Sequence, residues 1–125
     1  KGPEIFKVAP EMPRFPGCEA EEKLKDRKRC AQQELLKYIY KNVRYPASAH
    51  KLGVEGTVVV SFTVHSDGTI GDISLPRDIG GGCGEEGLRV VGQMHYQNIT
   101  WIPAKDGQGK PINCRFNMPI KFNLE

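Results

Sequence analysis

Four cysteines and three histidines are the side chains that could attack a substrate or bind a metal ion. Cys83 precedes a predicted helix, a position that can lower the pKa of a thiol and make it nucleophilic. A catalytic cysteine also needs a base, and His95 lies roughly 18 Å further along the same predicted helix. The two cannot form a catalytic pair, so we interpret Cys83 as a loop residue, either free or in a disulfide.

Other patterns that carry chemistry are present only in part. His50, His65 and His95 have no metal-binding spacing to each other or to the cysteines. Residues 82–87 (GCGEEG) match the glycine pattern of a dinucleotide site, but no strand–helix–strand unit follows and two glutamates would face the pyrophosphate. Asp67 is better explained as a turn residue than as a catalytic carboxylate. We therefore expect neither enzymatic activity nor a cofactor.

The composition limits the function classes further. The chain has 125 residues, enough for one domain with one hydrophobic core. Its net charge of +3, without a run of Lys and Arg interleaved with aromatics, argues against nucleic-acid binding. No apolar run is long enough to span a membrane, and no signal peptide is recognised. The start resembles a cut point in a longer chain, so we expect any anchor or export signal to lie upstream.

The first half of the chain reads as an extended lead-in followed by helices. Four prolines favour an extended conformation for residues 1–17, which we interpret as the end of a linker, with the domain over residues 18–125. The charged segment 21–29 is expected to be a solvated helix or loop. Residues 31–43 are predicted to be a helix, and residues 47–52 a short one that ends at a glycine. The apolar stripe of the longer helix consists of Leu35, Leu36, Ile39, Tyr40 and Val43.

The second half begins with a β-hairpin. Residues 57–64 are rich in β-branched side chains, an Asp-Gly pair marks the turn, and residues 69–75 form the return strand. We expect Ile73 and Leu75 to be core residues of that strand. A further helix over 85–95 and a final strand complete the order helix, strand, strand, helix, strand. This order predicts an α+β domain, a three-stranded antiparallel sheet with helices packed on one face.

The final stretch, residues 111–125, alternates without exception. Apolar side chains occupy the even positions, and the odd positions are polar, charged or proline. This pattern predicts a strand with one buried and one wet face. Pro119 has no N–H to give to a sheet, so one side of the strand should be open or interrupted. We interpret that edge as a surface to which a partner peptide adds itself as a further strand. Coverage by the N-terminal segment, or by a second copy in a strand-exchanged homodimer, is the alternative.

An even number of cysteines fits an oxidising compartment. Cys18 and Cys30 flank a charged segment, and a bridge between them would stabilise the domain by about 2–3 kcal/mol on the chain-entropy estimate. We favour this disulfide over two reduced thiols. Cys114 is on the apolar face of the final strand, so we expect it to be a small core residue.

An ordered set of motifs resembles the C-terminal domain of TonB, the energy transducer of Gram-negative outer-membrane transport. The resemblance covers about residues 31–125, and the ordered set is specific although each motif alone is weak. The lead-in with FPGC is similar to that of relatives with an extra N-terminal helix, which the resemblance implies here. The motifs are Tyr45-Pro46-Ala47-Ser48-Ala49, the run from Gly53 to Phe62, the Asp67-Gly68 turn, residues 85–94, Trp101-Ile102-Pro103-Ala104 and the final strand.

The resemblance implies a periplasmic domain of a protein anchored in the inner membrane. Such a domain binds the TonB box, an extended peptide of outer-membrane TonB-dependent transporters, and couples the proton-motive force to nutrient uptake. ExbB and ExbD would be partners of the part that precedes this sequence. The implied peptide-binding residues lie in the final strand and around the Tyr-Pro motif. They are Asn113, Arg115, Phe116, Asn117, Met118, Pro119, Ile120, Lys121, Phe122, Arg44, Tyr45 and Pro46.

Two other functions are consistent with a domain of this size. One is a docking or sensor domain of the same type on another membrane protein, such as a membrane-anchored peptidase. The other is a small secreted enzyme. The sequence lacks a nucleophile–base pair and a metal-binding pattern, which counts against the enzyme.

Overall fold

Three long strands build the sheet of this protein, whose computed structural model describes residues 4–124. The strands β2 (Gly56–Val64), β3 (Ile70–Arg77) and β5 (Pro111–Phe122) lie in the order β5-β2-β3 with antiparallel pairing. Two short strands, β1 (Ile5–Phe6) and β4 (Ala104–Lys105), pair with the beginning of β5. The predicted α+β fold with a three-stranded antiparallel sheet is therefore confirmed, and the two short strands are additions to it.

The pair β2–β5 forms the regular centre of the sheet. Nine consecutive residues of β2, from Gly56 to Val64, pair with nine of β5, from Phe122 to Cys114. Because both strands alternate, one face collects the apolar side chains of both. The fully or almost fully buried residues on that face are Val58, Val60, Phe62, Val64, Cys114, Met118, Ile120 and Phe122.

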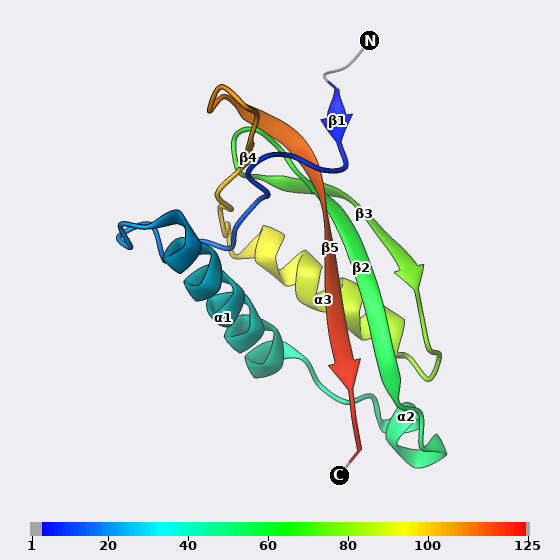
Figure 1. The fold of residues 1–125 in the computed structure, drawn as a ribbon. Coiled ribbons are helices and arrows are strands. Elements are labelled where there is room, and N and C mark those ends of the chain that lie inside the picture. The colour runs from blue at the N-terminus through cyan, green and yellow to red at the C-terminus, as the bar shows by residue number, and fades with distance from the viewer. Residues whose placement is uncertain (1–3, 125) are drawn as a thin grey trace.

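Three helices complete the fold: α1 (Leu24–Asn42), α2 (Ala47–Leu52) and α3 (Cys83–Tyr96). Figure 1 shows α3 behind the sheet and α1 alongside the edge formed by β5. Both helices contribute side chains to one core, Leu35 from α1 and Met94 from α3 among them. None of the helices in residues 4–124 is both long enough and apolar enough to cross a membrane.

Two helix boundaries test the sequence-based expectations. The short helix α2 has the predicted limits and ends at Gly53, whose φ of 69° is readily adopted by glycine. The start of α1 was predicted wrongly, because the helix begins at Leu24 instead of residue 31. Residues 25–29 of its added first turns are lysines, arginines and one aspartate, and no glycine or proline interrupts these turns. The charged segment is therefore largely helical.

The expectation that Ile73 is a core residue is wrong, since its side chain is 39% exposed. The pairing of β3 with β2 shifts register twice, and Asp72 has a positive φ of 50°. These irregularities break the simple alternation that the expectation assumed. Ile70, at the start of β3, is the residue buried in the core.

The proline-rich lead-in packs against the domain over part of its length. Phe15 lies in the core, with its ring centre 5.6 Å from that of Tyr38 and 5.5 Å from that of Trp101. The structure pairs Cys18 with Cys30 as a disulfide, with the two Cα atoms 5.8 Å apart. The disulfide therefore ties the end of the lead-in to the first turns of α1.

Candidate functional site

One side of β5 is open over most of its length. The backbone N–H of Lys121 donates to the hydroxyl oxygen of Tyr40 at 2.9 Å, so this N–H points away from β2. The N–H and C=O groups of an antiparallel strand alternate between its two sides, two residues apart. The free side therefore carries the backbone groups of the odd-numbered residues. These are Arg115, Asn117, Pro119 and Lys121.

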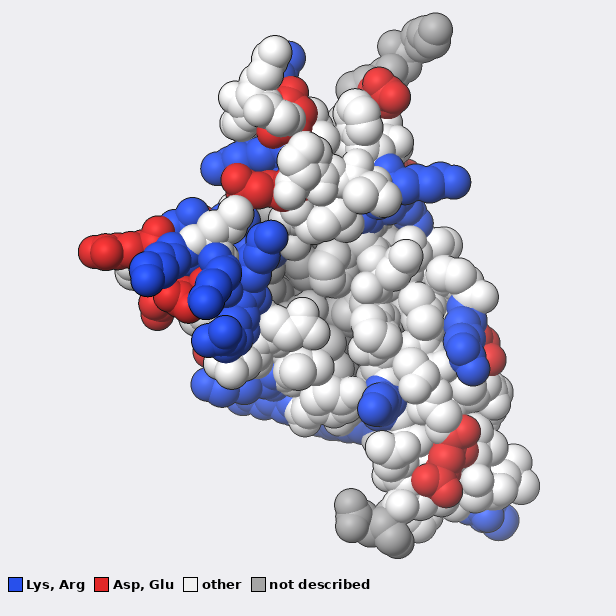
Figure 2. All heavy atoms as spheres, in the orientation of Figure 1, with Lys and Arg blue, Asp and Glu red and all other residues white. Residues whose placement is uncertain are grey.

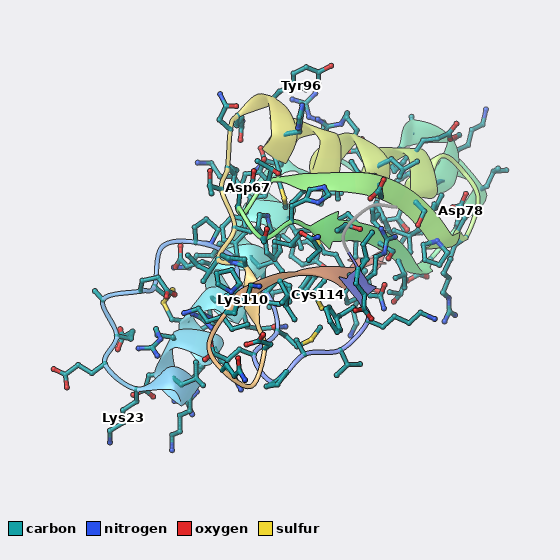
Figure 3. All side chains as sticks on the ribbon, turned by 90° about the horizontal axis from the view of Figure 1, so that it is seen from above. Lys23, Asp67, Asp78, Tyr96, Lys110 and Cys114 are labelled. Atoms are coloured by element: carbon teal, nitrogen blue, oxygen red, sulfur yellow. A yellow bond between two sulfur atoms is a disulfide. The ribbon has the colours of Figure 1, made fainter. Side chains whose placement is uncertain are left out.

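The beginning of this edge is covered by the protein's own N-terminal segment. Ile5 pairs with Asn113 and Phe6 with Cys114, in the parallel direction. Figure 3, in which Cys114 is labelled, shows β1 beside this end of β5. Within residues 4–124, the N-terminal segment pairs with this edge at two positions only, and the open edge runs from residue 115 to residue 121, about 20 Å at strand rise.

Asn113 is buried and its side chain is engaged within the domain. Its Oδ1 accepts a hydrogen bond from the backbone N–H of Ser66 at 2.8 Å, and its Nδ2 donates to the carbonyl of Glu4 at 3.5 Å. The structure therefore places this expected binding residue under β1 and not on the open edge.

The remaining residues of β5 separate by their exposure. Three have side chains that point into the core and backbone groups that face β2, so the open edge presents neither to a partner: Met118, Ile120 and Phe122. Three are exposed: Asn117, Pro119 and Lys121. Phe116 is half-buried against the rings of Phe62 and Trp101, with ring centres 5.7 and 4.9 Å away.

The side chain of Arg115 is tied to the outer face of the sheet. Its guanidinium donates to the hydroxyl oxygens of Thr63, Ser61 and Ser74 at 2.8, 2.8 and 3.2 Å, and to the carbonyl of Asp72 at 2.8 Å. These bonds reach across β2 to β3, so the side chain braces the sheet and leaves its backbone to face the edge.

Two hollows lie beside β5, the first enclosed by the lead-in, α1 and Phe116, and the second between α1 and the end of β5. The first, of about 270 Å³, is lined by Pro10, Met12, Pro13, Arg14, Phe15, Lys28, Ala31, Gln32, Leu35 and Phe116. The second, of about 550 Å³, is lined by Leu36, Tyr40, Pro119, Lys121 and Asn123. Figure 2 shows largely uncharged surface here, with Lys and Arg side chains gathered over α1. We call these two hollows together the α1–β5 groove.

The Tyr-Pro segment lies at the far end of β5. The ring of Tyr45 packs edge-on against that of Phe122, with ring centres 5.6 Å apart, and its hydroxyl donates to the carbonyl of Val54. Arg44 is exposed, and Pro46 is half-buried at the start of α2. The structure thus brings this segment next to the end of β5, whereas the open edge itself faces α1.

A small polar network joins this segment to α3. The carboxylate of Glu86 accepts the backbone N–H of Arg44 at 2.7 Å and the guanidinium of Arg89 at 2.7 Å. Arg89 also donates to the carbonyl of Asn42, the last residue of α1, at 2.7 Å. The hydrogen bond from Arg89 is the main reason why the pKa of the Glu86 carboxyl is lowered. The network fixes the end of α1 relative to α3.

The groups considered for catalysis are not assembled into a site. Cys83 is the first residue of α3 and, like Cys114, is buried and free, which corrects its interpretation as a loop residue. Burial raises the pKa of both thiols, which disfavours the reactive thiolate. Among the residues that the structure describes, no three His, Cys, Asp or Glu side chains lie close enough to hold a metal ion.

Sequence reasoning missed two residues of the groove. Leu36 and Tyr40 were expected to share the apolar stripe of the first helix, but only Ala31, Leu35 and Ile39 of α1 are buried. Leu36 and Tyr40 remain 41% and 46% exposed and face the groove. The signal was available in the sequence, since the stripe is wider than one packing face requires.

Comparisons with known proteins agree with this architecture. Residues 41–124 match the family model of the Gram-negative bacterial TonB protein C-terminal. Two NMR solution structures of Helicobacter pylori TonB-CTD, of residues 179–285 and 194–285, each share 23% identity over 75% of this chain. Their TM-scores are 0.57 and 0.54, with 80% and 94% of those chains covered, which indicates a common fold. A comparison with curated proteins finds no significant match. Because the family model spans more than half of the sequence, this chain belongs to the family of Gram-negative bacterial TonB protein C-terminal domains.

Proposed function

We propose that this chain is the periplasmic C-terminal domain of a TonB-type energy transducer. In this proposal it binds the TonB box, an extended peptide of an outer-membrane TonB-dependent transporter, as an added strand on β5. The observation that carries the proposal is the open edge from Arg115 to Lys121, on a strand whose pairing with β2 is unbroken. Membership of the TonB C-terminal family supports it independently.

The backbone of the edge is suited to this kind of binding. Arg115, Asn117 and Lys121 have N–H groups on the free side, whereas Pro119 can offer only its carbonyl. Each main-chain hydrogen bond contributes about 0.5–1.5 kcal/mol net. A short ladder therefore gives modest affinity that depends little on the partner's side chains.

Force transmission follows from the same ladder. A peptide pulled along its length loads several hydrogen bonds together, so a complex of modest affinity can transmit a pull. The proposed source of the pull is the proton-motive force, through ExbB and ExbD and a membrane anchor upstream of residue 1. The role requires neither a catalytic group nor a cofactor.

A peptide titration tests the proposal. Isotope-labelled domain is mixed with synthetic peptides from the N-terminal plug segments of TonB-dependent transporters, and amide shifts are followed by NMR. We expect shifts concentrated along residues 115–121 and near Tyr45, with none for a peptide of scrambled sequence. If a monomeric sample shows no shifts with any plug peptide, the proposal fails and a docking or sensor role is favoured instead.

A further inference from the structure

The helix beside the open edge lies almost entirely outside the family match. The match begins at residue 41, whereas α1 spans Leu24–Asn42. Contacts with the rest of the domain nevertheless hold α1 in place. Its inner face is buried through Ala31, Leu35 and Ile39, and its last carbonyl is bonded to Arg89 of α3. This helix is therefore a fixed neighbour of the edge.

The groove side of α1 is apolar and uncovered. Leu36 and Tyr40 are one helical turn apart, and both remain more than two-fifths exposed. With Pro119 and Lys121 of β5 they line the larger hollow of the α1–β5 groove. A strand added to β5 would direct every second side chain toward this surface, because side chains alternate between the two faces of a sheet.

The smaller hollow provides a second apolar position on the same side. Met12, Ala31, Leu35 and Phe116 are among its lining residues. Along β5, Pro119 and Lys121 of the larger hollow lie three and five positions from Phe116, which is about 10–16 Å at strand rise. Same-face side chains of an extended peptide are about 6.6 Å apart, so residues four positions apart, about 13 Å, can reach both hollows.

We propose that α1 is the second wall of the peptide groove, with Leu36 and Tyr40 binding an apolar side chain of the added strand. This proposal rests on the proposed function, and it specifies which kind of peptide the β5 edge binds. The occupant is an extended segment, neutral or acidic, with two apolar residues four positions apart. The charge follows from the lining, which includes Lys28 and Lys121 but no carboxylate.

The N-terminal segment is itself an example of a strand that pairs with this edge of β5. β1 pairs with Asn113 and Cys114 directly before the open part. At the other end, the Tyr40 hydroxyl holds the N–H of Lys121, which a longer peptide ladder would need. The apolar ring of Tyr40 therefore favours binding, whereas its hydroxyl competes with the last hydrogen bond of the ladder.

Variants on α1, made in the 125-residue domain, test the proposal with a plug peptide that shifts the β5 amides. Leu36→Ala/Tyr40→Ala should weaken binding about tenfold, because both apolar contacts are lost. Tyr40→Phe should bind as well as the unmodified protein or more tightly. Leu52→Ala, at a 74% exposed leucine on α2, is the matched control and should bind unchanged.

Alanine replacements in the peptide separate a direct contact from a structural effect. Replacing its groove-facing apolar residue should weaken binding to the unmodified protein but have little further effect on Leu36→Ala/Tyr40→Ala. If the α1 variants bind normally while Asn117→Pro does not, the wall is refuted and strand addition stands. If no plug peptide binds the unmodified protein, strand addition itself fails, and the wall fails with it.

Discussion

The two edges of the sheet differ in nearly every property that decides whether a strand accepts a partner. β5 keeps nine consecutive pairs with β2, whereas the pairing of β3 with β2 shifts twice. In β3, Asp72 has a positive φ, and Pro76 lacks the backbone N–H that would donate a hydrogen bond to a further strand. Irregular backbone of this kind discourages edge-to-edge pairing. The β3 edge is thus blunted by its own geometry.

The edge of β5 is protected in a different way. Its backbone is regular, and Pro119 is the one position without an N–H donor between residues 115 and 121, on the open side. Cover comes instead from other elements, namely β1 at one end and the Tyr40 hydroxyl at the other. Cover by separate elements can be displaced by a ligand, whereas an irregular strand cannot be straightened at low cost. Of the two edges, the β5 edge is therefore the one whose backbone suits the proposed strand addition.

Two proline substitutions at neighbouring positions should separate the two sides of β5, with the largest effect of any change considered. Met118 is buried and its N–H faces β2, so Met118→Pro should reduce the free energy of unfolding by at least about 3 kcal/mol. Asn117→Pro removes an N–H from the open side only and should cost about 1 kcal/mol or less. Urea unfolding measures both values.

The Asn117→Pro variant also tests, by peptide binding, whether β5 is the binding edge. Asn117→Pro should lower the affinity for a plug peptide at least about tenfold, since a ladder donor is lost and the edge is blocked. Asn117→Ala keeps the N–H and is the matched control. Unchanged affinity of a folded Asn117→Pro variant would remove β5 from the binding mechanism.

The disulfide should matter for the β5 side of the molecule and not for the β3 side. Cys18→Ser/Cys30→Ser releases the lead-in from α1 and should reduce stability by about 2–3 kcal/mol. Hydrogen exchange should become faster in the first turns of α1 and near Phe15, with β3 changing only as much as global stability requires. Finding two free thiols at positions 18 and 30 in the native protein would contradict this prediction.

Period-two alternation explains why so much of β5 could be predicted. In a strand with one buried face, the alternation determines that Met118, Ile120 and Phe122 are buried. Pro119, which lacks an N–H, indicates that one side of the strand is open. The C-cap glycine of α2 was equally readable, because left-handed backbone strongly favours glycine. These features depend on local backbone rules.

Features that depend on distant segments could not be predicted. The two-residue strand β1 covers Asn113 without any sequence pattern of its own. The width of the apolar stripe on α1 indicates that part of it stays exposed, but which residues do so, here Leu36 and Tyr40, depends on where β5 passes. Ile70 is buried in place of Ile73 because β3 is irregular around Asp72, whose positive φ is uncommon for a residue other than glycine and is not specified by the local sequence.

The smallest expected effect concerns the carboxylate that fixes the end of α1. The pKa of Glu86 is lowered in the folded protein, mainly by Arg89 and also by the N–H of Arg44, against an opposing effect of burial. A lowered pKa stabilises the fold above the ordinary glutamate pKa, and this contribution disappears as the pH falls through the folded-state value. Because Arg89 is nearly half exposed, Glu86→Gln should cost only about 1 kcal/mol at pH 7. The variant should also flatten the acid side of the stability profile measured by urea unfolding between pH 7 and 3. A cost that persists unchanged at pH 3 would show that the Glu86 charge does not hold α1 beside the β5 edge.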